Sequence, residues 1–327
     1  MKKINHINGI VDCHTHSGGM DFNNFYNHRY PNTQDVSVLH GLISNNAVDY
    51  AVTFPMPSTI YYNTGYYWKE KKFVPSGTSN FPFEIENEFL LKEIKMFGFD
   101  NVLPFLAFSL QDKIEEQCIF LRTMIEKYPV YGLKYHTKAD QNNIGQMKEK
   151  GRCFLNIAKE YNIPITFHTE KDGIASPMDI FELASLYPEV RFDMAHFAGF
   201  SKTFFQEYDE YNKNYGNVFI DSAPAIFLVS HISNQKNVIE LDYSNVIEVL
   251  RFFLEKYHDN FLWGTDAPWL FASQLDEGID GDVITYEDEV AVLKELKSTG
   301  ISFSQQAINR FLFGVKKEID YYENISN

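Results

Sequence analysis

Cysteine is scarce in this sequence, and long apolar runs are missing from it. The three cysteines, Cys13, Cys118 and Cys153, are an odd number without the spacing of a disulfide framework, so we expect a reducing compartment. No apolar run reaches the roughly 20 residues that a membrane-spanning helix needs, and the first residues lack the apolar stretch of a signal peptide. We therefore expect a cytoplasmic protein without a membrane partner.

Basic residues are also few. The chain has 29 lysines and arginines against 44 aspartates and glutamates, which gives a formal net charge of -15. Binding to a phosphate backbone requires a basic surface, so this balance argues against nucleic acid as a partner. Hydrophobic residues make up 44% of the 327 residues, which is enough for a large core. Because α/β barrels of this length fold as one unit, we expect a single domain over residues 1–327.

The most informative motif is a His-x-His pair near the start of the chain. His14 and His16 end the segment Val11–His16, and a Ser-Gly-Gly turn follows directly. Alternate side chains of a strand point to the same face, so both imidazoles would emerge together where the strand ends. Two imidazoles on one rigid strand make half of a divalent-metal site. The competing interpretation is a pair of hydrogen-bonded core histidines.

Three later strand ends carry further metal-ligand types. His168, His196 and Asp266 each end a short apolar run, at the point where turn residues begin. Four independent strand ends with this chemistry are hard to reconcile with chance. Several buried imidazoles and a carboxylate that converge without a cation would also be costly, because each would need its own hydrogen-bond partner.

Strand and helix patterns alternate along the chain. Eight strand–helix units in order indicate an α/β protein with a (β/α)8 TIM-barrel fold. The expected strands lie at 9–16, 48–54, 101–108, 130–136, 164–168, 190–196, 217–221 and 261–266. The expected helices lie at 36–43, 84–97, 113–128, 147–161, 178–186, 202–211, 244–257, 286–297 and 304–313.

The barrel would place these ligands together. Chemistry in such barrels sits at the carboxyl ends of the strands, and closure brings the eighth strand beside the first, so Asp266 would lie next to the His pair. We expect long βα-loop insertions at this catalytic face. One of them, residues 55–80, is rich in tyrosine, including Tyr61, Tyr62 and Tyr67. A substrate lid and a small aromatic core are both possible roles, and we favour the aromatic core.

The ordered motifs resemble the amidohydrolase superfamily, and more narrowly its second amidohydrolase family, which includes aminocarboxymuconate-semialdehyde decarboxylase. The resemblance spans nearly the whole chain. The segments that carry it are Val-Asp-Cys-His-Thr-His at 11–16, Gly-Leu-Lys-Tyr-His at 132–136, Ile-Thr-Phe-His at 165–168, Met-Ala-His-Phe-Ala-Gly at 194–199, Trp-Gly-Thr-Asp-Ala-Pro at 263–268 and Ile-Asn-Arg-Phe-Leu-Phe-Gly at 308–314.

The resemblance implies that His14, His16, His168 and Asp266 bind one divalent metal. Zn²⁺ is the default for such a nitrogen-rich set, although Mn²⁺ or another transition metal would fit. The metal would activate a water that attacks the carbonyl of an amide, ester or lactone in a small-molecule substrate. Asp266 or His196, the implied catalytic residues, would accept the proton and pass it to the leaving group.

Lys134 and His136 are possible additional site residues, because they share one strand face. Binuclear relatives carry a carboxylated lysine at this place that bridges two metals, whereas many members of the second family bind one metal. A contact of Lys134 with substrate or with Asp266 is the interpretation we favour. Asp12, one pleat deeper than the His pair, is expected to orient it or to accept structural hydrogen bonds. Arg29, in the first βα loop, could clamp a substrate carboxylate, although a surface ion pair is the simpler interpretation.

The sequence thus predicts a metal-dependent hydrolase. The alternative is a metal-dependent non-oxidative decarboxylase of an aromatic or unsaturated carboxylic acid, which would need a basic group to clamp the carboxylate. A protein that only holds a metal is disfavoured, because it would not need His196 and Asp266 as a proton shuttle. Family members are commonly homodimers or larger, so the resemblance also implies a homo-oligomer.

Overall fold

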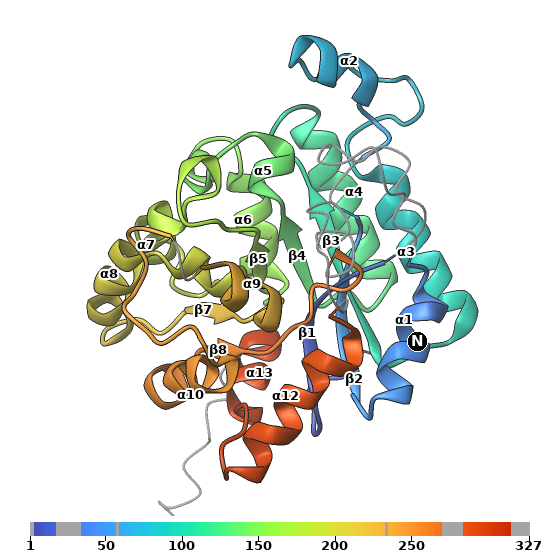
Figure 1. The fold of residues 1–327 in the computed structure, drawn as a ribbon. Coiled ribbons are helices and arrows are strands. Elements are labelled where there is room, and N and C mark those ends of the chain that lie inside the picture. Colours follow the sequence, from blue (N-terminus) through green and yellow to red (C-terminus); the bar gives the residue numbers. More distant parts are fainter. Residues whose placement is uncertain (1–2, 18–33, 57–58, 233–234, 270–283, 315–327) are drawn as a thin grey trace, which may run out of the picture.

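The apolar runs of the sequence form eight parallel strands, each hydrogen-bonded to the next along the chain (Figure 1). The computed structural model describes residues 3–17, 34–56, 59–232, 235–269 and 284–314. The strands are β1 (Val11–His16), β2 (Tyr50–Phe54), β3 (Val102–Phe108), β4 (Gly132–Tyr135), β5 (Ile165–Phe167), β6 (Phe192–Met194), β7 (Val218–Asp221) and β8 (Phe261–Leu262). Nearly all their side chains are buried, as expected for parallel strands covered by helices.

The segment after β8 closes the barrel against β1. The backbone hydrogen bonds across this seam are Cys13 N–Trp263 O (2.9 Å), Asp266 N–His14 O (2.8 Å) and His16 N–Ala267 O (2.7 Å). The Asp12 carboxylate adds two bonds, from the Thr265 backbone N–H (3.0 Å) and from its hydroxyl (2.7 Å). The predicted (β/α)8 barrel is therefore confirmed.

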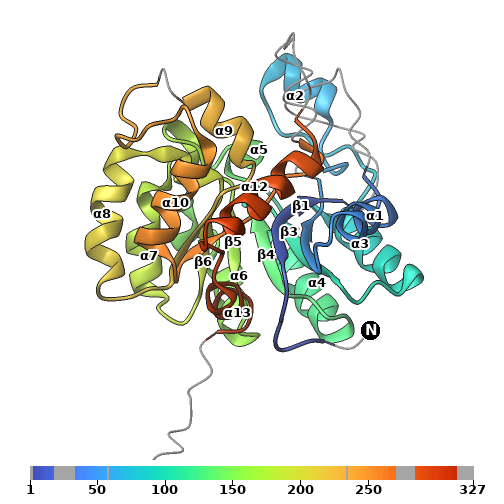
Figure 2. The same cartoon turned by 60° about the horizontal axis from the view of Figure 1, so that its bottom comes forward.

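Helices surround the strands on the outside (Figure 2). They are α1 (Val36–Asn45), α2 (Thr64–Glu70), α3 (Glu84–Phe97), α4 (Ile114–Lys127), α5 (Thr137–Asp140), α6 (Arg152–Glu160), α7 (Ile180–Leu186), α8 (Lys202–Asn212), α9 (Ala225–Ile232), α10 (Val246–Tyr257), α12 (Tyr286–Ser298) and α13 (Gln305–Phe313). Single 3₁₀ turns also occur, at η1 (Ile144–Lys148), η2 (Gly173–Ala175), η3 (Pro177–Asp179) and η4 (His196–Phe200). No helix in the described ranges is long and apolar enough to cross a membrane.

Two helix predictions need correction. The segment between 222 and 243 was expected to be a loop, but it contains α9, whose sequence Ala-Ile-Phe-Leu-Val-Ser-His-Ile is too uniformly apolar to show a helical period. The helix expected from residue 147 begins at Arg152, because the 3₁₀ turn η1 ends at Lys148 and Gly151 occupies the N-cap of α6.

The residues 55–80 contain a small aromatic cluster. Tyr61, Tyr62 and Tyr67 are buried, and Phe73 packs against them. The α2 helix of this insertion projects away from the barrel (Figure 1). The cluster fits the aromatic-core interpretation, because these rings bury one another.

Cys118 on α4 and Cys153 on α6 form a disulfide, with Cα atoms 6.3 Å apart. The cysteine spacing did not predict this pairing. The inference of a reducing compartment from the cysteines therefore loses its basis. Cys13 is buried and free.

Phe253 lies at the centre of the aromatic packing between α10 and the barrel. Its side chain is fully buried, and its ring centroid lies 5.0 Å from that of Phe197 and 5.1 Å from that of Phe261. Buried aromatic side chains of this kind dominate the packing energy of a core. The ring therefore ties an outer helix to β8 and to the turn that carries His196.

We expect the substitution Phe253→Ala to lower the free energy of unfolding by about 3–5 kcal/mol, because it removes transfer energy and leaves a cavity. Urea denaturation measures the change. The matched control is Phe89→Ala on α3, where the ring is 47% exposed, and its cost should stay within about 0.5 kcal/mol. Equal costs for both variants would contradict the central position of Phe253.

Candidate metal centre

His14, His16 and Asp266 come together at the carboxyl end of β1. Both imidazoles are buried, and each Nε2 lies 3.4 Å from Oδ1 of Asp266. One ligand atom from each of the three residues lies within 4.8 Å of the other two. Asp266 reaches this position because its backbone N–H bonds to His14 across the barrel seam.

The imidazoles of His14 and His16 are oriented through their Nδ1 atoms. His14 Nδ1 lies 2.7 Å from Oδ2 of Asp221, and His16 Nδ1 lies 3.2 Å from the carbonyl oxygen of Pro55. Because these oxygens accept hydrogen bonds, each Nδ1 carries the proton and each Nε2 presents a lone pair toward Asp266. Metal-binding histidines are commonly held in this way.

Electrostatics favours the metal-binding protonation states. Burial lowers the pKa of His14 well below its ordinary value, and the charge of Lys134 lowers it further. Burial also lowers the pKa of His16. Burial opposes ionisation of Asp266, but the surrounding imidazoles of His16, His14 and His196 hold the pKa of its carboxyl below the usual range. The site therefore offers neutral imidazoles and a carboxylate.

His168 and His196 lie side by side at the same end of the barrel. His196 Nδ1 bonds to the Ala223 carbonyl oxygen, so Nδ1 is the protonated atom and Nε2 is the acceptor. His196 Nε2 lies 3.0 Å from His168 Nδ1, which must then be the donor. His168 Nε2 is left as a buried lone pair that has no hydrogen-bond partner among the described atoms.

His168 thus has a free lone pair on Nε2 that suits a metal ligand, although it is not part of the group formed by His14, His16 and Asp266. The nearest acidic atom to its Nε2 is Oε1 of Glu170, at 3.7 Å. Its assignment as the fourth metal ligand stays a prediction. An orphaned imidazole nitrogen in a buried polar site nevertheless fits a cation, because such atoms are rarely left unpaired.

The turn that presents His196 has an unusual backbone. His196 through Phe200 all have positive φ, from 50° to 64°. A Cβ atom at Gly199 would lie 2.1 Å from the backbone nitrogen of Lys171, so only glycine fits there. The Asp221 carboxylate holds the start of this turn through Oδ1, which accepts from the His196 backbone N–H at 3.0 Å.

Lys134 reaches the centre of the cluster. Its Nζ lies 3.1 Å from His14 Nε2 and 4.3 Å above the ring centre of Phe54. Burial lowers the pKa of Lys134 to about 8, against the opposing effect of Asp221 and Asp266. A buried amine with a lowered pKa thus lies directly beside the candidate metal-binding group of His14, His16 and Asp266.

His136 lies beside this cluster and does not join it. The His136 ring stacks on that of His168 at 4.0 Å, and its Nδ1 accepts from the Ala139 backbone N–H at the start of α5. That geometry makes His136 an N-cap that supports His168. Arg29 lies outside the described residues.

Sequence reasoning missed Asp221. This buried carboxylate ends β7, touches His14 through Oδ2, and accepts the backbone N–H groups of His196 and Ala223 through Oδ1. The signal was present, since an aspartate ends an apolar strand here just as Asp266 follows β8. Asp12, by contrast, accepts from Thr265 and from the His14 backbone N–H at 3.2 Å, which is the structural role expected for it.

A cavity of about 510 Å³ opens beside His168, His196 and Asp266. Its size lies in the range of small-molecule sites. Its apolar wall comes from α9 and the residues around it, namely Pro224, Phe227, Leu228, Ile232 and Phe200. The α9 helix, which the sequence did not predict, therefore forms much of the described wall of this cavity.

No protein-family model matches this chain, and no curated protein matches it in sequence. Solved structures share its fold at low identity. A probable 2-pyrone-4,6-dicarboxylic acid hydrolase from Acinetobacter baumannii has a TM-score of 0.58 and 14% identity, covering 94% of this chain and 100% of that one. A 5-carboxyvanillate decarboxylase from Sphingomonas paucimobilis has a TM-score of 0.57 and 10% identity, and the match covers 93% of this chain and 98% of that one. An amidohydrolase from Burkholderia multivorans with bound zinc has a TM-score of 0.56 and 10% identity, and the match covers 94% of this chain and 96% of that one.

Glu289 on α12 holds the start of α9. Its Oε1 accepts from the Ile226 backbone N–H at 2.9 Å, and its side chain is fully buried. Burial raises the pKa of Glu289 to about 8, and the charge of Asp12 adds to the effect. The α9 wall of the cavity beside His196 and Asp266 is thus held to α12 through a carboxyl group that is neutral at moderate pH.

We expect Glu289→Gln to change how stability depends on pH. A carboxyl pKa raised from 4.5 to about 8 contributes stability that is fully present below pH 4.5 and is lost as pH rises through about 8. Glutamine keeps the acceptor for Ile226 but cannot ionise. Above pH 8 the variant should therefore be more stable than wild type, by up to about 5 kcal/mol.

Urea denaturation at pH 5 and pH 9 measures this effect. The control is Glu287→Gln, an exposed glutamate on the same helix, which should leave the pH dependence unchanged. A Glu289→Gln variant whose stability falls with pH as steeply as that of wild type would contradict the buried, protonated carboxyl.

Proposed function

We propose that this chain is a metal-dependent hydrolase of the amidohydrolase type, and that it acts on a carbonyl group of a small molecule. The single observation that carries the proposal is the group of His14, His16 and Asp266, in which both imidazoles are anchored through Nδ1 and turn Nε2 toward one carboxylate. Such pre-organisation serves metal binding better than it serves packing.

His14, His16 and Asp266 would hold the metal, with His168 as the fourth ligand through its orphaned Nε2. Three imidazoles and one carboxylate suit Zn²⁺ best among common metals, and Mn²⁺ would also be accommodated. A bound Zn²⁺ supplies two kinds of chemistry, namely a lowered pKa of water and polarisation of a carbonyl. The amidohydrolase structure with bound zinc shares this fold, which supports the choice of metal.

The residues around the metal centre would handle the proton. Asp266 is ionised, because its pKa lies below the usual range, so it can accept a proton from the attacking water. Burial lowers the pKa of His196 to about 4, so its Nε2 is an acceptor that can receive this proton and deliver it to the leaving group. Both residues line the cavity beside the group of His14, His16 and Asp266.

Lys134 leaves two forms of the metal centre to consider. As an amine, it would contact the substrate or Asp266, and the centre would hold one metal. As a carboxylated lysine, it would bridge two metals. We propose the mononuclear form, because the described residues bring only three ligands within 4.8 Å.

A second candidate function is non-oxidative decarboxylation, since the 5-carboxyvanillate decarboxylase shares the fold. That reaction needs a basic group that holds the substrate carboxylate. Lys171 lines the cavity, but its Nζ donates to the Lys236 carbonyl oxygen at 2.8 Å. Lys138, nearby, pairs with Glu170. These two lysines already have partners, which leaves Lys134 as the described cation that would hold a carboxylate. Hydrolysis is our main proposal because the group of His14, His16 and Asp266 suits a metal-activated water.

Metal content per chain is the first test. We expect about one Zn²⁺ or Mn²⁺ per chain by elemental analysis, and its loss in the double variant His14→Ala/His16→Ala. The matched control is His6→Ala/His258→Ala, two exposed histidines, which should keep the metal. Two metals per chain would favour the bridging lysine, whereas no retained or rebound metal would sink the hydrolase proposal.

A second test concerns His196. In a screen of esters, lactones, amides and aromatic acids, we expect turnover of a carbonyl substrate without release of CO₂. The variant His196→Gln should then lose about 10²–10⁴-fold in kcat, because the proton shuttle is missing, while its metal content stays at the wild-type value. His258→Gln is the control. Release of CO₂ from an aromatic acid would assign the decarboxylase function instead.

A further inference from the structure

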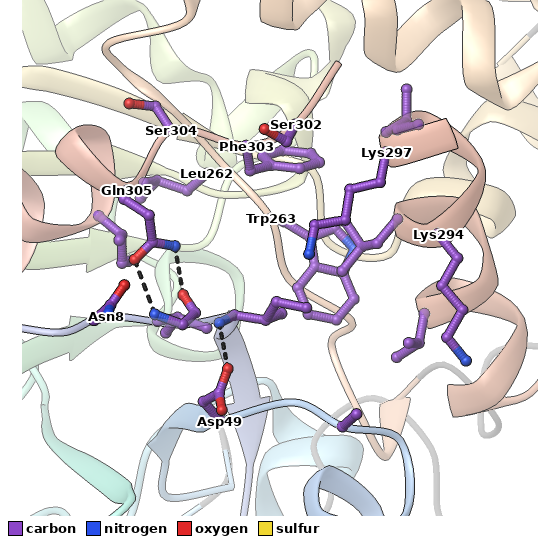
Figure 3. Close-up of a pocket in the computed structure, with 18 of the residues that line it drawn as sticks. Asn8, Asp49, Leu262, Trp263, Lys294, Lys297, Ser302, Phe303, Ser304 and Gln305 are labelled. Atoms are coloured by element: carbon purple, nitrogen blue, oxygen red, sulfur yellow. Dashed lines mark hydrogen bonds between the residues drawn. The ribbon is translucent and has the colours of Figure 1, made fainter. Parts of the chain in front are cut away.

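A second cavity, of about 610 Å³, lies at the opposite end of the barrel from the metal centre. It sits where β1 begins, between the closing seam and the helices α12 and α13 (Figure 3). The loop before β2 contributes Ala47 and Asp49, and loops that enter the strands lie at the end of a barrel away from its chemistry. The metal centre and this cavity are therefore separate sites.

The walls of this cavity are mainly apolar. They come from β1, β8, α12 and the loop before α13, and they include Ile10, Leu262, Val290, Leu293, Phe303 and Ile308. The Trp263 ring lies among them (Figure 3). Its indole N–H is buried and has no hydrogen-bond partner in the described part of the chain, which is uncommon for a buried donor. The walls thus suit an apolar body that carries an acceptor.

The polar rim of this cavity is cationic. Lys294 and Lys297 stand one turn apart on α12, and Lys297 extends toward Trp263 (Figure 3). Neither ammonium has a carboxylate within 4.0 Å among the described residues. The one acidic side chain in the lining, Asp49, is already engaged, since it accepts from the Ile10 backbone N–H at 2.7 Å. In a chain of net charge -15, two lysines without a carboxylate partner in the described part of the chain, beside an apolar cavity, point to an anionic ligand group.

We propose that this cavity is a second ligand site, which binds a small amphipathic carboxylate. Its hydrocarbon body would lie against the Trp263 ring and the apolar faces of α12 and β8. Its carboxylate would pair with Lys297, whose side chain extends toward Trp263, while Lys294 adds positive charge at the rim but points away from that ring (Figure 3). A volume of about 610 Å³ is in the range that holds such a molecule. This inference does not depend on the hydrolase proposal.

The test uses octanoate as the probe, titrated into the purified full chain by isothermal titration calorimetry. We expect binding of one octanoate per chain, and weaker binding of octylammonium, which has the same tail and the opposite charge. The variant Lys294→Gln/Lys297→Gln should weaken octanoate binding by about three- to tenfold, through loss of the exposed Lys297 ion pair and of the Lys294 charge at the rim. Both lysines are exposed, so this variant should fold.

Two further variants distinguish this cavity from a general effect of net charge and from the metal centre. Lys92→Gln/Lys95→Gln on α3 has the same spacing and the same change in net charge, and it should bind octanoate like wild type. His14→Ala/His16→Ala should also keep octanoate binding, because the probe does not use the metal centre. The proposal is overturned if octanoate does not bind at millimolar concentration. It is also overturned if octylammonium binds equally well, if both lysine pairs behave alike, or if loss of the His pair abolishes binding.

Discussion

The closing of β8 onto β1 is the constraint on which the metal centre depends. β8 has only two residues, so the seam relies on three backbone hydrogen bonds and on the two bonds that the Asp12 carboxylate receives from Thr265. One of the backbone bonds joins Asp266 to His14 directly. The proposed metal ligands of β1 and of the segment after β8 are therefore brought together by main-chain geometry, which does not rely on the flexible side chains themselves.

Carboxylates behind the imidazoles then set the chemistry of the site. Asp221 touches His14 with one oxygen and holds the turn of His196 with the other, so a single buried side chain positions two of the histidines. Each ring is hydrogen-bonded through Nδ1, whereas Nε2 of His14 lies beside Lys134 and Nε2 of His196 accepts from His168. Lys134 is the one cationic side chain at the centre among the described residues, and burial lowers its pKa toward the neutral form.

Much of the fold could be predicted from the sequence, because barrel strands are short apolar runs with polar residues at their ends. His14, His16 and Asp266 were found by this signal, and α3 lies at the predicted bounds. The α9 helix could not be found in the same way, since its residues are apolar on nearly every side and show no period. Tertiary contacts of the imidazoles, such as the hydrogen bond between His168 and His196, also cannot be predicted from the spacing of residues along the sequence. Asp221 was visible in the sequence, but strand-end aspartates without a neighbouring motif are easily taken for turn residues.

The disulfide between α4 and α6 acts on the chain before it folds. It joins residues 35 positions apart and so limits how far the unfolded chain can expand around β4, the strand that carries Lys134. In the chain-entropy view, a loop of this size removes about 3–4 kcal/mol of conformational freedom from the unfolded state. The two cysteines lie on the outer helices, and neither touches the metal centre. Reduction would therefore make the unfolded state more accessible while the arrangement of the ligands in the folded molecule stayed the same.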